Sequence, residues 1–146
     1  MVTLAGNIKL MIMKITPLLL VAITFFIAKT SSAQIDMPVD SVQHVLCQKW
    51  EFKAVLMGGQ RLTNMNESVN YQFKQDRSFT RVSSKGKEEK GSWVFNLEQK
   101  VVLLKIKKVS LHIPLLSKDE LVIAPGDGSG SASNALGVGT ILQPSL

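Results

Sequence analysis

The chain has 146 residues, the length of a single domain, and a formal net charge of +6 from 17 Lys and Arg against 11 Asp and Glu. The first 33 residues contain three lysines and no acidic residue, so the other 113 carry 14 basic and 11 acidic residues, a net charge of +3. These figures exclude a multidomain enzyme and argue against a strongly basic nucleic-acid-binding protein. The single cysteine excludes a small domain held together by internal disulfides.

Residues 1–33 have the organisation of a secretion signal. Lys14 supplies positive charge, residues 15–28 form an apolar run, and Ser31-Ser32-Ala33 provides small residues for a cleavage site. A helix needs roughly 20 apolar residues to span a bilayer, so this shorter run predicts a cleaved signal peptide, with an uncleaved N-terminal anchor as the alternative. Translation could also begin at Met13. The expected location is the periplasm or the outside of the cell.

Residues 34–45 are expected to be a short lead-in to the main domain. Pro38 interrupts this segment, and Asp40 could cap one helical turn that runs to Cys47. Cys47 lies beside apolar residues and is interpreted as a small buried hydrophobic side chain. An intermolecular disulfide or a reactive thiol is the alternative.

Residues 46–146 are dominated by short β-patterns at regular spacing. Alternation over residues 50–57 places Trp50, Phe52, Ala54 and Leu56 on one face of a strand, and Gly58-Gly59 predicts the following turn. Further strands are expected at residues 69–73, 78–82, 91–96, 101–106, 109–113, 120–124 and, weakened by two glycines, 136–143. About eight short strands with hairpin-length turns predict an all-β fold, a sandwich or an antiparallel up-and-down barrel.

Four motifs occur in an order typical of one protein family. They are Cys47-Gln48-Lys49-Trp50-Glu51-Phe52, the hairpin segment 71–79, Lys90-Gly91-Ser92-Trp93, and Asp119-Glu120-Leu121-Val122-Ile123. With them, residues 46–143 resemble the small lipocalin-like domain of secreted bacterial proteins. The resemblance implies a compact antiparallel β-barrel in which Trp50 plugs the closed end. By analogy with true lipocalins it also implies a small hydrophobic ligand.

The chain departs from the pattern in several respects, and Gln48-Lys49-Trp50 lacks the Gly of the Gly-x-Trp motif of true lipocalins. Arg77 replaces the hairpin glycine, which would cost on the order of 1 kcal/mol if that residue has a positive φ. In addition, no basic residue follows Lys118, so no late arginine is present to cover Trp50 as in true lipocalins.

Inward-facing aromatic residues are the candidate ligand-binding set, because apolar rings line most small-molecule sites. The alternative is that the same rings form the hydrophobic core of a small barrel. The set comprises Phe52, Tyr71, Phe73, Phe79, Trp93 and Phe95.

The sequence contains no pattern typical of catalysis or of a metal site. His44 and His112 are 68 residues apart, and the single Cys47 adds no clustered ligand spacing. The adjacent acidic pairs would point to opposite faces of a strand and so would not form a dyad. We therefore expect a protein that is not an enzyme and has no cofactor or metal.

Five lysines form a candidate surface for an envelope protein partner: Lys85, Lys87, Lys90, Lys105 and Lys107. Lys105 and Lys107 are expected on one strand face, and the others on a neighbouring hairpin. Such lysines also commonly only solubilise a hairpin or protect a sheet edge. Two functions are thus expected: binding of a small hydrophobic ligand, or a protein-binding module, such as an inhibitor or accessory subunit, with a filled barrel.

Overall fold

The computed structural model describes residues 34–66, 68–129 and 137–146, so the predictions made for residues 1–33 lie outside the described residues. The described ranges contain one helix and nine strands. These elements are α2 (Val39–Leu46), β1 (Lys49–Met57), β2 (Gln60–Leu62), β3 (Val69–Phe73), β4 (Ser78–Ser83), β5 (Glu88–Asn96), β6 (Val101–Ile106), β7 (Val109–Leu116), β8 (Leu121–Pro125) and β9 (Val138–Pro144).

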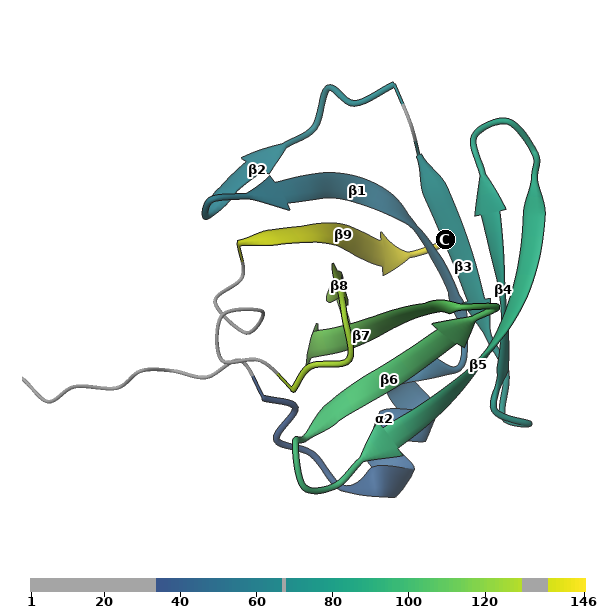
Figure 1. Ribbon diagram of the computed structural model, residues 1–146, viewed down its shortest axis with the longest axis vertical. Helices are drawn as coiled ribbons and strands as arrows, with labels where there is room; N and C mark the ends of the chain where they lie inside the picture. Colours follow the sequence, from purple (N-terminus) through teal and green to yellow (C-terminus); the bar gives the residue numbers. More distant parts are fainter. Residues whose placement is uncertain (1–33, 67, 130–136) are drawn as a thin grey trace, which may run out of the picture. The chain divides into compact units, whose positions relative to one another are not determined.

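The strands form one antiparallel sheet that closes into a barrel (Figure 1). From β3 to β9 each strand pairs with the next strand along the chain, and β1 pairs with both β3 and β9. All strands except β2 therefore close the barrel, which confirms the predicted eight-stranded antiparallel architecture. β2 extends the sheet beyond β1 through a two-residue turn at Gly58 and Gly59, whose φ values of 56° and 81° suit glycine.

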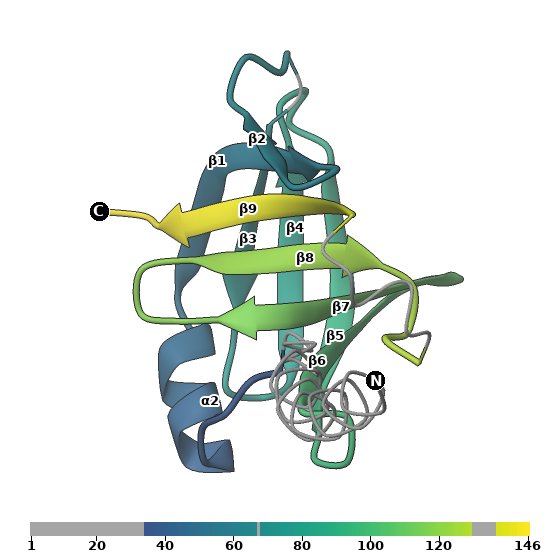
Figure 2. The ribbon, with the colours of Figure 1, turned by 90° about the vertical axis from the view of Figure 1, so that its left-hand side faces the viewer.

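The last strand completes the closure. β9 lies between β8 and β1, with Leu142 paired with Leu121 on one side and Phe52 on the other. Figure 2 shows β9 running between β1 and β8 across the wall of the barrel. The predicted last strand is thus present from Val138, while Leu136, where we expected it to begin, lies outside the described residues.

β1 contains a β-bulge between Phe52 and Ala54, where its register against β9 shifts by one residue. An extra residue in a strand reverses the face of every side chain that follows it. Trp50 and Phe52 accordingly contact the main hydrophobic cluster inside the barrel, whereas Ala54 and Leu56 belong to a second cluster. The prediction that these four side chains share one face is wrong, because strict alternation assumes an uninterrupted strand.

α2 lies at one end of the barrel (Figure 2). The helix begins at Val39, after Pro38, and no side chain caps its N-terminus, so the predicted capping role of Asp40 is wrong. Asp40 lies within the first turn instead. Val42 and Leu46 are four residues apart and therefore share a helix face, which is buried in the main cluster. The expected single turn is thus an eight-residue helix that closes this end of the barrel.

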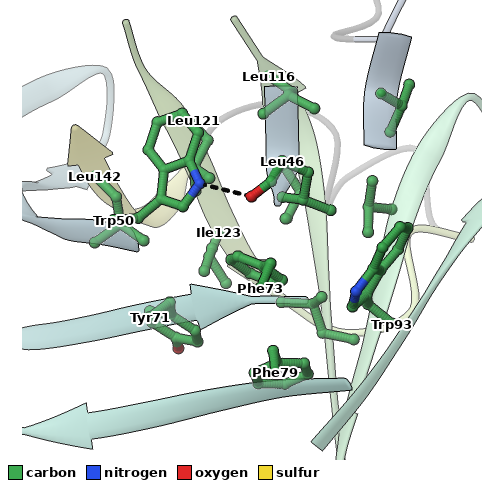
Figure 3. Packing of buried hydrophobic residues seen from close by; sticks show 14 of the residues in the cluster. Leu46, Trp50, Tyr71, Phe73, Phe79, Trp93, Leu116, Leu121, Ile123 and Leu142 are labelled. Carbon is green, nitrogen blue, oxygen red and sulfur yellow. Dashed lines mark hydrogen bonds between the residues drawn. The ribbon is translucent and has the colours of Figure 1, made fainter. Parts of the chain in front are cut away.

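Aromatic side chains fill the interior beyond this helix. Trp50 is 1% exposed, and its indole Nε1–H donates to the Leu46 carbonyl oxygen at 3.0 Å (Figure 3). The ring of Phe73 lies 5.9 Å from that of Tyr71 and 5.3 Å from that of Phe79, measured between centroids. Such spacings are typical of favourable aromatic pairs. The burial of Trp50 agrees with its predicted structural role.

The β3–β4 hairpin contains the strained residue that the sequence suggested. Arg77 has a φ of 68°, in the left-handed region of the backbone that residues other than glycine rarely adopt. Three contacts hold the turn: the Arg77 guanidinium lies 4.5 Å from the centre of the Trp93 ring, Trp93 Nε1–H donates to the Lys74 carbonyl at 3.0 Å, and Asp76 accepts the backbone N–H of Ser78 at 2.9 Å. These contacts offset the backbone strain.

Candidate functional site

The open end of the barrel contains a cavity of about 180 Å³. It lies beside the last residues of β1 and the first residues of β9, whereas α2 leads into the first residue of β1 at the opposite end. The cavity is lined by Val55, Tyr71, Arg81, Leu111, Ile123, Ala124, Pro125, Val138, Gly139 and Thr140. Most of this lining is apolar, as is usual for a small-molecule site.

Strand alternation explains why an arginine lines this cavity. Phe79 is buried in the barrel interior, and Arg81 is two residues further along β4, so both side chains point inward. Arg81 is paired directly with Tyr71 of β3, whose neighbour two residues away is the buried Phe73. The guanidinium and the phenol therefore lie side by side on one part of the wall.

The Glu89 carboxylate lies among three basic side chains, those of Arg81, Lys87 and Lys107, and these four residues form the rim of the cavity. Glu89 is the cross-strand partner of Arg81, and the charged atoms of the two side chains are 3.8 Å apart. Lys87 Nζ is 3.5 Å from the Glu89 carboxylate and Lys107 Nζ is 3.8 Å from it. Because one negative charge faces three positive charges, the rim carries a net positive charge.

Tyr71 contributes a neutral hydroxyl to the cavity. Its pKa is raised above the ordinary value, mainly because burial disfavours the phenolate; Arg81 lowers the pKa and Glu89 raises it. The hydroxyl is therefore protonated at neutral pH. Within the described part of the chain it donates no hydrogen bond to another residue, so this donor is free for a ligand.

The structure separates the six predicted ligand-binding aromatic residues by depth. Tyr71 alone among them lines the cavity at the open end. The rings of Phe73, Phe79, Trp93 and Phe95 are buried in the main cluster, and Phe52 packs against that cluster while remaining partly exposed. Phe73 and Phe79 pack against the Tyr71 ring in the interior (Figure 3). Trp93 and Phe95 instead line separate cavities elsewhere on the barrel.

Sequence reasoning missed most of the cavity wall. Arg81 could have been found, because it follows Phe79 at the spacing of two that marks one strand face. Val55 could not, since the bulge in β1 reverses the face on which it was expected. Leu111, Ile123 and Thr140 carry no signal that distinguishes them from core residues before the register of the barrel is known.

The five lysines proposed as a partner surface divide into two groups. Lys87 and Lys107 belong to the rim around Glu89, whereas the exposed residues Lys85, Lys90 and Lys105 are outside it. Lys107 lies in the β6–β7 turn with a φ of 53°. The expectation that Lys105 and Lys107 share a strand face is therefore wrong.

Outside this cavity, His112 is the polar side chain that the described part of the chain buries. His112 is fully buried; its Nδ1 is 3.1 Å from the Gly126 carbonyl oxygen, and its Nε2 has no hydrogen-bond partner among the described residues. In residues 34–66, 68–129 and 137–146, no three His, Cys, Asp or Glu side chains lie together in a way that could hold a metal ion. Within the same ranges, no helix combines the length and apolar character needed to cross a bilayer.

No protein-family model and no curated protein sequence matches the chain. Among solved structures, the chain is similar to an NMR structure of a protein from Bacteroides uniformis ATCC 8492, with 16% identity and a TM-score of 0.46. That match covers 70% of this chain and 90% of the other.

Proposed function

We propose that the protein is a small binding barrel that holds one small hydrophobic molecule at its open end, without catalysing a reaction, and that it acts in the periplasm or outside the cell. The observation that carries this proposal is the cavity of about 180 Å³ at the end of a closed barrel. The opposite end is filled by α2 and Trp50, so a ligand would reach this cavity from the open end.

The cavity size limits the part of a ligand that can be buried. An apolar protein cavity of about 150 Å³ is large enough to bind benzene. By that comparison, the open end accommodates a hydrocarbon group of roughly six to eight carbon atoms. This is smaller than the pockets of about 300–1,000 Å³ that enclose drug-sized ligands. A larger molecule would bind with one end in the barrel and the rest outside it.

The barrel provides a rigid frame for such a site. Val55, Leu111 and Ile123 come from three different strands, and each strand is hydrogen-bonded on both sides. The aromatic rings below them fill the interior and leave little freedom for the wall to collapse. A site that is formed before the ligand arrives loses less conformational entropy on binding.

The direct test is native mass spectrometry of the protein, combined with NMR titration of 1-octanol. We expect a co-purifying small molecule or saturable octanol binding, with chemical-shift changes at Val55, Ile123 and Thr140. Thr140→Phe should abolish binding, because the added ring fills the cavity. Val94→Phe is the matched control, since Val94 is 53% exposed and does not line this cavity. Absence of a ligand together with no octanol binding would overturn the proposal.

A protein-binding module is the second candidate function. The exposed lysines Lys85, Lys90 and Lys105 favour it, because in the described structure none of them forms an ion pair with a carboxylate. Charge reversal at Lys90 and Lys105 would then abolish capture of an acidic envelope protein and leave octanol binding unchanged. Thr140→Phe would do the reverse, so the two variants distinguish the two functions.

A further inference from the structure

The open end of the barrel combines an apolar cavity with an excess of positive charge. Arg81, Lys87 and Lys107 approach Glu89 at 3.5–3.8 Å. Charge-assisted hydrogen bonds between a nitrogen cation and a carboxylate are shorter, at about 2.7–2.9 Å. Three basic side chains thus share one carboxylate without a close contact, and the donors of the Arg81 guanidinium remain available.

Arg81 and Tyr71 present their donors to the same space. Both side chains line the cavity, and they are directly paired across β3 and β4. The guanidinium is a planar fork that suits the two oxygens of a carboxylate. The Tyr71 hydroxyl adds a neutral donor beside it. An acceptor that carries negative charge would satisfy both groups, whereas a hydrocarbon would leave both without a partner.

The other walls of the cavity favour hydrocarbon. Val55, Leu111, Ile123 and Val138 line it, together with Pro125, and none of these side chains offers a hydrogen-bonding group. A molecule that fits the whole surface therefore has one apolar portion and one anionic group next to it. A cation would be repelled by Arg81, and an uncharged alcohol would use only part of the donor capacity.

We propose that the open end of the barrel binds a single-chain amphiphile with a monoanionic head, the head held by Arg81 and Tyr71 and the hydrocarbon buried against Val55, Leu111 and Ile123. This inference rests on the proposed function, since it names the chemical class of the ligand for the same cavity. Lys87 and Lys107 attract the anion toward the rim, and Glu89 opposes it.

Three ligands of equal chain length test the charge requirement: octanoate, 1-octanol and octylammonium, titrated by NMR at pH 7.5 and low salt. We expect octanoate to bind at least tenfold more tightly than 1-octanol, and octylammonium to bind most weakly. The preference for octanoate should shrink in 0.5 M salt, because exposed charges are screened. Equal affinity for octanoate and octanol would overturn this inference but leave the proposed function intact. No binding of any of the three would overturn both.

Substitutions of residues at the rim provide a second test of the inference. Arg81→Met should weaken octanoate binding at least tenfold and leave octanol binding nearly unchanged, while Arg81→Lys should have an intermediate effect. Lys90→Met, on the outer surface, is the matched control and should change neither affinity. Tyr71→Phe removes one donor but keeps the ring, and it should weaken octanoate binding several-fold. Unchanged octanoate affinity in Arg81→Met would overturn the inference.

Glu89→Gln tests the inference in the opposite direction. This variant removes the one carboxylate that faces Arg81, Lys87 and Lys107, so octanoate should bind several-fold more tightly than in the unchanged protein. Damage to the fold would not produce such a gain, and weaker octanoate binding would contradict the inference. Vesicles of anionic phospholipid distinguish the source of the head group: vesicle binding without octanoate binding would overturn the single-chain assignment.

Discussion

Gly91 is the position where a single added methyl group should have the largest effect on folding. A Cβ atom there would lie 2.5 Å from the Lys105 carbonyl oxygen, and equally 2.5 Å from Cζ of the Phe79 ring. Gly91 does not have a positive φ, so its backbone conformation alone would accept alanine. The predicted destabilisation of Gly91→Ala is therefore entirely steric.

The magnitude follows from what can move. Carbon atoms pack at about 3.5–4.0 Å, so the Phe79 ring would have to shift by about 1 Å. That ring is 1% exposed and lies 5.3 Å from Phe73 and 6.0 Å from Tyr71, between centroids. The Lys105 carbonyl is part of the β5–β6 ladder and moves only with its strand. Overpacking usually costs about 1–3 kcal/mol. Two simultaneous clashes place Gly91→Ala at about 3 kcal/mol.

Urea unfolding, followed by far-ultraviolet circular dichroism, measures this loss as a change in the free energy of unfolding. Gly86→Ala is the control, because Gly86 has a φ of 78° but no neighbour within 4 Å, and should cost about 1 kcal/mol from backbone strain alone. Phe79→Leu removes the ring atoms that clash, so Gly91→Ala should cost about 1–2 kcal/mol less in that background. The reasoning fails if Gly91→Ala costs no more than Gly86→Ala.

Three further predictions concern residues outside the cavity. Trp50→Phe should lower the free energy of unfolding by about 1–3 kcal/mol, because the Leu46 carbonyl then loses a buried donor; an unchanged urea midpoint would contradict this. Hydrogen bonding from Arg61 lowers the pKa of Glu120, so its contribution to stability is complete above the ordinary value of 4.5 and is lost as the pH falls through the lowered folded pKa. Glu120→Gln should therefore reduce the loss of stability between pH 5 and pH 3, whereas Glu88→Gln, at an exposed position, should leave that loss unchanged. Burial raises the pKa of Cys47, so a thiol reagent at pH 8 should modify the folded protein more slowly than the urea-unfolded protein, and equal rates would refute this.

The barrel could be predicted from the sequence because its strands are short, regularly spaced and joined mainly by tight turns. The alternation of Tyr71 with Phe73, and of Trp93 with Phe95, agrees with their burial in the main cluster. Alternation along one strand does not show which residues of a neighbouring strand it pairs with. The bulge after Phe52 is defined by pairing with β9, a strand about 90 residues later in the chain, and no local pattern marks it.

The full length of α2 and the position of the cavity could not be predicted either, because local sequence patterns do not mark them. The apolar positions of α2 amount to two buried residues over two turns, which is too short a pattern to stand out from a loop. The cavity wall consists mostly of ordinary apolar residues from several strands, and these residues come together only when the sheet closes into a barrel. Arg81 is the exception, because a charged side chain on an inward strand face is unusual and can be read from its spacing to Phe79.

The aromatic stack determines both how the barrel is stabilised and where a ligand can bind. Phe73 and Phe79 are 2% and 1% exposed, so their rings form core and leave no passage toward Trp50. Tyr71 lies next to both rings and also lines the cavity, and its hydroxyl donates to no other residue in the described part of the chain. Truncation of the Phe73 side chain should therefore lower the free energy of unfolding more than it lowers the affinity for a ligand. Replacement of Arg81 should instead alter binding while the core stays packed, because the side chain lies at the rim rather than in the stack.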